Sequence, residues 1–357
     1  MRIGIDVSQI IYETGVSWYT RKLVENLLKI DTENEYILFG GSLRRLKDLK
    51  LKTEDLEGNV NKRFFPIPPT LADLVWNRLH ILPIEVFTGN LNVFHSSDWS
   101  QPPSKAFKIT TVHDLSPIKF PEYTDPKIVN VHKRRFDWVI REVDKIIVPS
   151  KAVRDELVSF SIPENKIRVI PEAPTIEAPA SKESIEKVMR NYSIRSKYLL
   201  SIGVGPRKNT QRIIEAFKLM GIQGLYQLVI VGEIKGEYEV NKDIIFTGHI
   251  LQTELKALYS GAETLIYPSL DEGFGLPILD AFVCSCPVVT SNIGSMSEIS
   301  GYAAVLVDPY EVKSIAKGVK EALENRDNLI KKGLQRVKQF SWRKTAQETL
   351  KVYQEVK

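Results

Sequence analysis

The sequence is poor in cysteine and has no long hydrophobic run. Its 357 residues include two cysteines, Cys284 and Cys286, with one residue between them. This number and spacing exclude a disulfide framework and do not match paired zinc ligands. No stretch approaches the roughly 18 uninterrupted apolar residues of a membrane span, and Asp6 interrupts the amino-terminal apolar run. We therefore expect a protein of a reducing cytoplasm with no transmembrane segment and no secretion signal.

The sequence also lacks a marked excess of either charge. It contains 49 Lys and Arg against 44 Asp and Glu, a net charge of +5. A nucleic-acid-binding protein would show a strongly basic stripe or patch, so nucleic acid is excluded as a partner. The basic residues between positions 44 and 63 are diluted by acids, which favours a solvated face over a membrane patch.

Several motifs of other enzyme classes are missing. The sequence has no Asp-x-Asp pair for a metal that bridges a diphosphate, no Walker Gly-Lys-Ser/Thr and no His-Glu-x-x-His. The dinucleotide fingerprint Gly-x-Gly-x-x-Gly is incomplete, because Gly203 and Gly205 are followed by Lys208. A hydride-transferring enzyme is thereby disfavoured, and we expect no cofactor and no metal. If a diphosphate is bound, protein cations take the place of the metal.

What the sequence does contain is an alternation of β-branched runs and helical patterns, which occurs twice. Because most runs are apolar on both faces, they predict parallel sheets covered by helices. The predicted strands are residues 2–6, 36–39, 91–95, 107–112, 145–148 and 167–170, and then 198–203, 227–232, 243–247, 264–267, 287–290 and 304–307.

Three prolines between positions 171 and 179 interrupt this alternation and indicate a linker. We therefore predict the α/β class, with Rossmann-like doubly wound domains at residues 1–175 and 176–341 that face each other across a cleft. Ligands of such sheets bind at the carboxyl ends of the strands. A last helical pattern, residues 342–357, is expected to pack back on the first domain or to stay on the second.

The most informative stretch is residues 267–281, where a strand ends, a glycine-containing turn follows and a helix opens. Pro277 is well tolerated in the first turn of that helix, and the free backbone N–H groups at the helix start could bind an anion. Glu272 on the turn and Asp280 about one turn into the helix place two carboxylates where they could bind a polyol. The alternative is a capped helix with solvated acids.

Three further candidates lie at predicted strand ends. Arg207 and Lys208 precede a helix, where two cations suit a phosphate or diphosphate; the alternative is a solvated basic turn. Gly15 follows the first strand and could let the backbone approach a phosphate, but an ordinary loop is the simpler interpretation. His113 ends another strand, and a lone histidine in that position is more often structural.

Together these residues resemble the retaining glycosyltransferases of family 4. Residues 272–277, Glu-Gly-Phe-Gly-Leu-Pro, with an acid eight residues after Glu272, are similar to that family's signature. Residues 111–114, 120–123, 148–150, 167–171, 206–209 and 308–309 also resemble its pattern. The resemblance extends from about residue 4 to the last helix and implies the B-type architecture with two Rossmann-like domains. It implies that residues 1–175 form the acceptor-side domain and residues 176–341 the nucleotide-sugar donor domain.

The resemblance also implies roles for individual residues. Arg207 and Lys208 would hold the donor diphosphate. Glu272 would contact hydroxyls of the transferred sugar, and Asp280 would hold the ribose. His113 would lie beside the anomeric carbon. The remaining donor-site positions are Gly15, whose loop would close over the donor, Ile250 near the nucleobase, and the amides of Phe274, Gly275 and Leu276.

The sequence departs from the family pattern at four places. Asp280 stands where the family usually has glutamate, so the ribose contact is one methylene shorter. The loop between Gly203 and Pro206 is one residue shorter, and Ser17 and Ser285 replace common glycines. None of these changes removes a charge from the predicted site.

From these observations we expect a metal-independent, retaining glycosyltransferase. It would move a hexose, with mannose and glucose as candidates, from a nucleotide diphosphate sugar to a glycan or lipid-linked acceptor in bacterial surface polysaccharide assembly. A nucleotide-sugar epimerase and a non-catalytic sugar-nucleotide-binding subunit are the alternatives. Peripheral contact with the inner face of the cell membrane is left open, as are the nucleobase and the oligomeric state.

Overall fold

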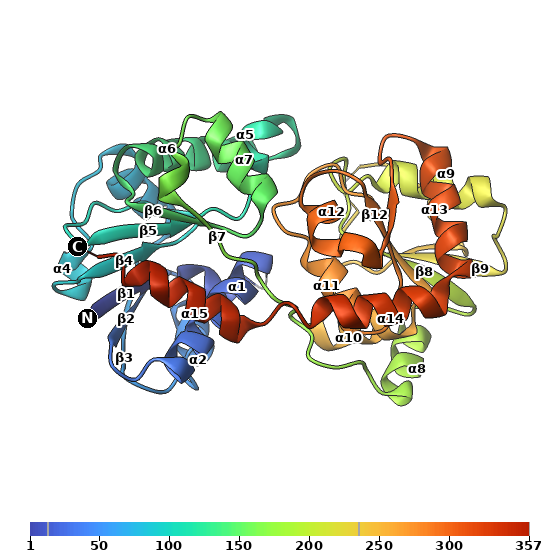
Figure 1. The fold of residues 1–357 in the computed structure, drawn as a ribbon, viewed down its shortest axis with the longest axis horizontal. Coiled ribbons are helices and arrows are strands. Elements are labelled where there is room, and N and C mark those ends of the chain that lie inside the picture. The colour runs from blue at the N-terminus through green and yellow to red at the C-terminus, as the bar shows by residue number, and fades with distance from the viewer. Residues whose placement is uncertain (13, 235, 357) are drawn as a thin grey trace. The chain divides into compact units, whose positions relative to one another are not determined.

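The computed structural model describes residues 1–12, 14–234 and 236–356, and the chain divides into two compact units (Figure 1). Unit 1 comprises Met1–Glu172 and the residues from Ser341 onward, and unit 2 comprises Ala173–Phe340. The sequence analysis placed this boundary between residues 175 and 176. Residue 357, the end of the predicted helix 342–357, lies outside the described residues.

Unit 1 is built on a parallel sheet of seven strands among the described residues. Its first strand in the sequence, Arg2–Asp6, pairs on both sides, with Ile3 opposite Tyr36 and Val93. The strands, in spatial order, are β3 (Val60–Phe65), β2 (Glu35–Gly41), β1 (Arg2–Asp6), β4 (Val93–Ser96), β5 (Phe107–Thr111), β6 (Lys145–Val148) and β7 (Ile167–Val169).

Helices flank this sheet, and the last helix of the chain packs on the first (Figure 1). In chain order they are η1 (Ser8–Tyr12), α1 (Gly15–Ile30), α2 (Leu46–Leu51), α3 (Pro69–Ala72), the π-helix η2 (Asp73–Arg78), α4 (Glu85–Thr88), α5 (Ser116–Lys119), η3 (Pro121–Tyr123), α6 (Pro126–Glu142), α7 (Lys151–Ser159), η4 (Glu164–Lys166) and α15 (Trp342–Tyr353). The ring of Trp342 on α15 meets that of Tyr19 on α1 edge-on, with centroids 6.0 Å apart. The last helix therefore belongs to unit 1.

Unit 2 repeats the design with a parallel sheet of six strands in its described part. In spatial order they are β10 (Ile244–Phe246), β9 (Tyr226–Val231), β8 (Lys197–Ile202), β11 (Thr264–Tyr267), β12 (Val288–Ser291) and β13 (Val305–Val307). Its helices are α8 (Lys182–Asn191), α9 (Thr210–Met220), α10 (Gln252–Gly261), α11 (Leu276–Val283), α12 (Gly294–Ser300), η5 (Gly301–Ala303), α13 (Val312–Glu324) and α14 (Arg326–Val337).

The twelve predicted strands are confirmed as strands, and one further strand was missed. The missed strand, β3, has Lys62 and Arg63 in its middle and lies at the edge of the sheet. Charged side chains are common on edge strands because they discourage pairing with other chains, so its pattern did not resemble a buried strand.

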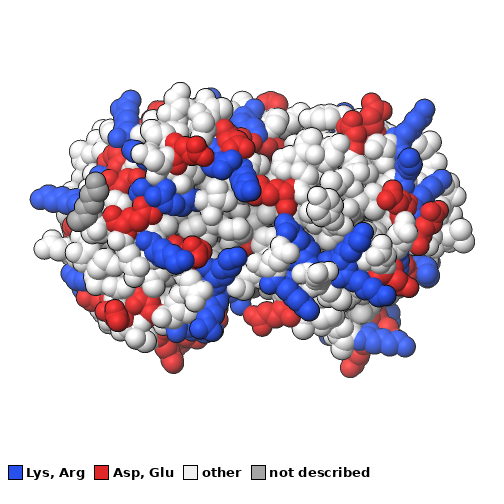
Figure 2. All heavy atoms as spheres, in the orientation of Figure 1, with Lys and Arg blue, Asp and Glu red and all other residues white. Residues whose placement is uncertain are grey.

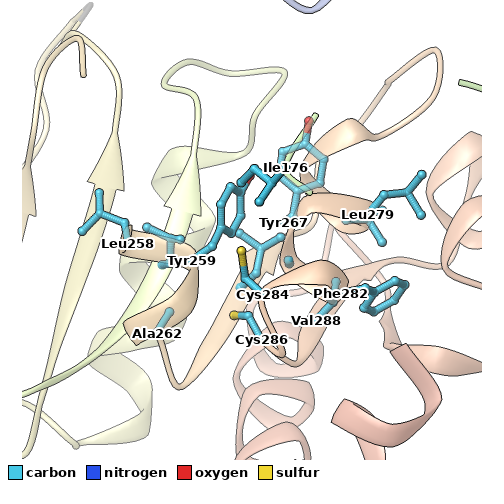
Figure 3. Close-up of a cluster of buried hydrophobic side chains, with 14 of the residues drawn as sticks. Ile176, Leu258, Tyr259, Ala262, Tyr267, Leu279, Phe282, Cys284, Cys286 and Val288 are labelled. Carbon is cyan, nitrogen blue, oxygen red and sulfur yellow. The ribbon is translucent and has the colours of Figure 1, made fainter. Parts of the chain in front are cut away.

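Buried side chains of unit 2 form a dense cluster beside β11 and α11 (Figure 3). Tyr259, Tyr267 and Phe282 are almost completely buried there. Cys284 and Cys286 lie in the same cluster and are free thiols. Burial raises the pKa of Cys284 to about 11, so this thiol is protonated at neutral pH. The two cysteines are therefore packing residues.

Within the described residues no helix is long and apolar enough to cross a membrane. On the face drawn in Figure 2, basic and acidic side chains both occur over each unit. This mixture agrees with the nearly balanced charge of the sequence.

Candidate functional site

The predicted cationic loop and the predicted acidic turn meet at the carboxyl edge of the unit 2 sheet. The first follows β8 and the second follows β11, and these strands are neighbours in the sheet. The backbone N–H of Leu270 donates to the carbonyl oxygen of Arg207 at 2.9 Å. The guanidinium of Arg207 donates to the carbonyl oxygen of Asp271 at 2.7 Å. The two loops are therefore held together by one backbone–backbone hydrogen bond and by one from the Arg207 side chain.

Glu272 is held between both cations. Its Oε1 accepts a hydrogen bond from Nζ of Lys208 at 2.5 Å, and its Oε2 lies 3.1 Å from Nη1 of Arg207. Burial on its own would raise the pKa of Glu272, but the charges of Lys208 and Arg207 outweigh it and lower the pKa to about 2. The carboxylate is therefore ionised at all physiological pH values.

Lys208 connects this ion cluster to the core. Its Nζ also donates to Oη of Tyr267 at 2.8 Å, and the ring of Tyr267 lies in the buried cluster of Figure 3. Burial on its own would lower the pKa of Lys208, but the neighbouring Glu272 raises it, so the ammonium stays charged. Two of its three N–H groups have these partners in the described residues, so the third is available to a ligand.

The backbone beside Lys208 requires glycine. Gly203 follows β8 with φ at +87°, a region that L side chains rarely adopt. A Cβ atom there would stand 2.9 Å from the aliphatic carbons of Lys208. The absence of a side chain at Gly203 therefore leaves room for the Lys208 side chain to reach Glu272.

The helix that follows the acidic turn begins as predicted. Gly275 is the N-cap of α11 with φ at +103°, and Pro277 lies in the first turn. The side chain of Phe274 is buried and meets the ring of Phe340 edge-on at 6.0 Å. Only the backbone of Phe274 could therefore serve a ligand. Leu276, the first residue of α11, is partly buried against the same core.

Asp280, which was predicted to contact the ribose, makes hydrogen bonds within the protein. Its Oδ1 accepts from the backbone N–H groups of Thr175 at 2.7 Å and Ile176 at 3.1 Å, and its Oδ2 accepts from the hydroxyl of Thr175 at 2.8 Å. Burial raises the pKa of Asp280 to about 6, although these donors oppose the rise. In this structure Asp280 thus braces the segment where unit 2 begins.

In unit 1, His113 follows β5 and is paired with a buried acid. Its Nδ1 lies 3.0 Å from Oε1 of Glu172, and the ring of Tyr19 meets the imidazole edge-on at 4.6 Å. Burial on its own would lower the pKa of His113, but the hydrogen bond and charge of Glu172 raise it. His113 therefore takes up a proton more readily than a free histidine does.

A second buried histidine, His95, belongs to a hydrogen-bond network beside His113. His95 lies between the hydroxyls of Tyr353 at 2.7 Å and Thr111 at 2.9 Å, and Tyr19 is 3.1 Å from the same threonine. Burial lowers the pKa of His95 to about 3, so it is neutral. The network fixes α15 and α1 to the carboxyl edge of the sheet beside His113.

The two remaining predicted site residues are Gly15 in unit 1 and Ile250 in unit 2. Gly15 is the first residue of α1, after the N-cap Thr14, whose hydroxyl accepts from the N–H of Ser17 at 3.4 Å. It therefore lies in a helical turn, where the sequence analysis expected a loop. Ile250 follows β10 and is partly buried against the core of unit 2.

The structure thus brings Arg207, Lys208 and Glu272 together, and it adds three residues that sequence reasoning missed. These are Tyr267, Glu172 and Thr175. The available sequence signals were Tyr267 at the end of an apolar strand and Glu172 among the prolines of the linker. No group of three or more His, Cys, Asp or Glu side chains in the described residues forms a metal-binding cluster.

Replacement of Asp280 by alanine should destabilise the protein. Two buried N–H groups and one hydroxyl would lose their acceptor, and each unsatisfied buried group costs about 1–3 kcal/mol. We expect the free energy of unfolding to fall by about 2–5 kcal/mol in a urea titration, whereas Glu324→Ala at an exposed position should change it by less than about 0.5 kcal/mol. Equal stabilities of Asp280→Ala and the native protein would contradict the bracing role.

Replacement of Glu172 by glutamine should lower the pKa of His113 while keeping the shape of the side chain. The raised pKa of the folded state contributes stability below the unfolded value of about 6.5, and this contribution is lost as the pH rises through the folded value. Glu172→Gln should therefore cost most stability at acid pH. NMR titration of the histidine ring protons measures the pKa, with Glu183→Gln as the control. An unchanged His113 titration would refute the pairing.

Comparison with known proteins identifies the family. The family model described as Glycosyltransferase Family 4 matches residues 14–173, and the model described as Glycosyl transferases group 1 matches residues 184–339. O-antigen chain mannosyltransferase B of Escherichia coli is 27% identical over 95% of this chain and 96% of its own. Serotype-specific mannosyltransferase WbdA of Escherichia coli is 28% identical over 67% of this chain and 32% of its own length.

A solved structure extends the likeness to the fold. The complex of Anabaena HepE with UDP-glucose superposes with a TM-score of 0.72, covering 99% of each chain at 16% sequence identity. The two matched family models lie in the two units and together span most of the sequence. The chain therefore belongs to the group 1 and family 4 glycosyltransferases, with the two-Rossmann fold of such enzymes.

Proposed function

We propose that the protein transfers a mannosyl residue from a nucleotide diphosphate sugar to a hydroxyl group of a surface polysaccharide or of its lipid-linked precursor. The sugar and the setting are supported by relatives that are named as mannosyltransferases, one of them of the O-antigen chain. A nucleotide-sugar donor is supported by the HepE complex with UDP-glucose, which shares the fold. The two free, buried cysteines fit a reducing cytoplasm.

The observation that carries the proposal is the cluster of Arg207, Lys208 and Glu272. Two cations face one carboxylate, so the cluster keeps a positive charge, and it lies where the sheet ends and helices begin. A diphosphate has the charge and the oxygen acceptors for this arrangement. Glu272, which is ionised, accepts hydrogen bonds from the hydroxyls of the sugar that the diphosphate carries.

The reaction breaks the bond between the anomeric carbon and the phosphate oxygen and forms a bond between that carbon and the acceptor oxygen. The acceptor loses its proton to the departing phosphate, and the nucleotide diphosphate leaves with the bonding electron pair. Charge on the leaving group grows in the transition state, and Arg207 and Lys208 stabilise it in a partly buried site. We propose that acceptor and leaving group share one face of the sugar, which gives retention.

In this proposal Arg207 and Lys208 do the work that a divalent cation performs in other transferases. They are held in position by Glu272, by Tyr267 and by the backbone of the turn before they meet a ligand. Such preorganisation reduces the reorganisation that the transition state requires. We propose that His113, which Glu172 holds in position, contacts the transferred sugar, as the family resemblance implies.

Replacement of Arg207 by alanine should lower kcat about 100-fold or more, which is the usual loss for one group that stabilises a developing negative charge. Donor affinity should fall less, because the bound donor carries less charge on the leaving oxygen than the transition state does. Steady-state kinetics and calorimetry separate the two effects, and Arg190→Ala on the exposed face of α8 serves as control. Equal losses in affinity and kcat would contradict the role in the transition state.

A donor screen with the native protein tests the proposed function. The UDP, GDP, ADP and dTDP derivatives of mannose and of glucose would each be added at high concentration. A ligand at about 100 times its Kd should add about 2.7 kcal/mol to the free energy of unfolding. We expect a mannose donor to stabilise most and to be consumed with a glycan acceptor, in the presence of excess EDTA. Consumption without an acceptor would indicate an epimerase, and a requirement for added Mg²⁺ or Mn²⁺ would refute the role of the two cations.

A further inference from the structure

The acidic turn, residues 268–272, has a backbone that other elements of unit 2 hold in place. It follows β11 directly, and Glu272 is its last residue. Loops are ordinarily more mobile than the strands and helices they connect. Here, side chains remote in the sequence donate to the carbonyl oxygens of the turn: Asn209 to Pro268, Ser291 to Ser269, Arg207 to Asp271 and Ser295 to Glu272. Its peptide groups are therefore fixed before a ligand is bound.

Strand β12 supplies hydroxyl groups along one side of the turn. It lies beside β11 in the sheet, with Thr290 opposite Tyr267, and α12 follows it in the chain (Figure 1). The hydroxyl of Thr290 donates to the carbonyl oxygen of Tyr267 at 2.8 Å, and that of Ser291 donates to the carbonyl oxygen of Ser269 at 2.5 Å. The end of β12 therefore aligns the start of the turn.

Ser295 holds the residue that carries the carboxylate. It is the second residue of α12 and has an exposed fraction of 0%. Its hydroxyl donates to the carbonyl oxygen of Glu272 at 2.6 Å. Serines at a helix start commonly cap their own helix, but the N-cap of α12 is Ile293, which makes no side-chain cap bond. The Ser295 hydroxyl therefore serves the turn instead of its own helix.

Asn209 holds the other end of the turn. It follows Lys208 with φ at +62°, the left-handed region that asparagine adopts more readily than most residues. Its buried Nδ2 donates to the carbonyl oxygens of Pro268 at 3.0 Å and of Pro309 at 2.6 Å, and its Oδ1 accepts from Nη1 of Arg212 at 3.0 Å. One amide group thus links the loops that follow β8, β11 and β13.

Glu272 is thereby fixed at both ends. Its carboxylate is paired with Lys208 and Arg207, and its carbonyl oxygen is held by Ser295. Without that hydroxyl the carbonyl oxygen would lose its partner, and the peptide group could rotate. The rotation would shift the carboxylate of the same residue relative to a bound sugar. A displacement of about 1 Å in a reacting site can cost about 100-fold in rate.

We propose that Ser295 is a positioning residue of the transfer reaction, which sets the place of Glu272 against the hydroxyls of the transferred sugar. The inference deepens the proposed function and rests on it. Ser295 acts through Glu272 and does not touch the substrate itself. Arg207 and Lys208 keep their bonds to Asp271 and Tyr267 when the hydroxyl is removed. Loss of the hydroxyl should therefore weaken the hold on the sugar and leave the hold on the diphosphate intact.

Hydrogen exchange read by mass spectrometry tests the fixing of the turn in the full-length protein without a ligand. In Ser295→Ala the amides of residues 268–275 should exchange about tenfold faster than in the native protein. Ser297→Ala is the matched control, because this serine lies on the same helix and its hydroxyl donates to Gly294 at 3.1 Å. That variant should exchange as the native protein does. Unchanged exchange of the turn in Ser295→Ala would overturn the proposal.

Binding and turnover test the role in transfer. The probes are GDP-mannose and UDP-glucose, each compared by calorimetry with GDP or UDP alone. We expect Ser295→Ala to bind the preferred nucleotide sugar about fivefold more weakly, to bind its bare nucleotide as before, and to have a kcat about tenfold lower. Equal losses for the nucleotide sugar and the bare nucleotide would indicate a general distortion of the site and would contradict the positioning role.

A second variant covers the case that Ser295→Ala does not fold. Ser295→Cys keeps a side chain of similar size with a weaker hydrogen-bond donor. It should show the same pattern of exchange, binding and turnover with smaller changes. Native exchange and native kcat in the folded cysteine variant would refute the role of the hydroxyl.

The two experiments separate this proposal from the proposed function. A native protein that turns over no donor would refute the transfer reaction, while faster exchange of the turn in Ser295→Ala would still support the fixing of Glu272. Turnover of a mannose donor with the native kcat in Ser295→Ala would refute the positioning role alone.

Discussion

The burial of Glu272 between two cations is the constraint on which the donor side of the molecule depends. A carboxylate removed from water is stable only when it is paired and hydrogen-bonded, and Lys208 and Arg207 supply both conditions. The loops after β8 and β11 must therefore meet, and Tyr267 ties the lysine to the core. The excess of one positive charge is the basis on which we propose a diphosphate site there.

The segment that joins the two units carries a second constraint. Glu172 pairs with His113 in unit 1, and Thr175 and Ile176 bond to Asp280 in unit 2. Two residues that were predicted to act on the donor thus also hold the ends of the joining segment. A test of their predicted roles must therefore separate a loss of activity in variants of His113 or Asp280 from a loss of structure.

The two acids of the signature show how the surroundings of a carboxyl group determine its pKa. Glu272 and Asp280 lie eight residues apart and are both buried, yet their pKa values move in opposite directions, to about 2 and about 6. Cations surround the first and outweigh the cost of burial, whereas backbone N–H groups and a hydroxyl surround the second and do not outweigh it. Their opposite pKa shifts therefore follow from partners that are remote in sequence.

Local patterns in the sequence were enough to predict twelve strands, the two α/β units and the clustering of Arg207, Lys208 and Glu272, because apolar runs and strand-end motifs encode them. The edge strand β3 was missed because its charged residues face solvent. Tertiary structure alone decided that Glu172 pairs with His113, that Asp280 braces Thr175 and that Ser295 holds the backbone of Glu272. These features depend on contacts between segments far apart in the chain, and a local pattern carries no information about which distant groups will satisfy a buried charge.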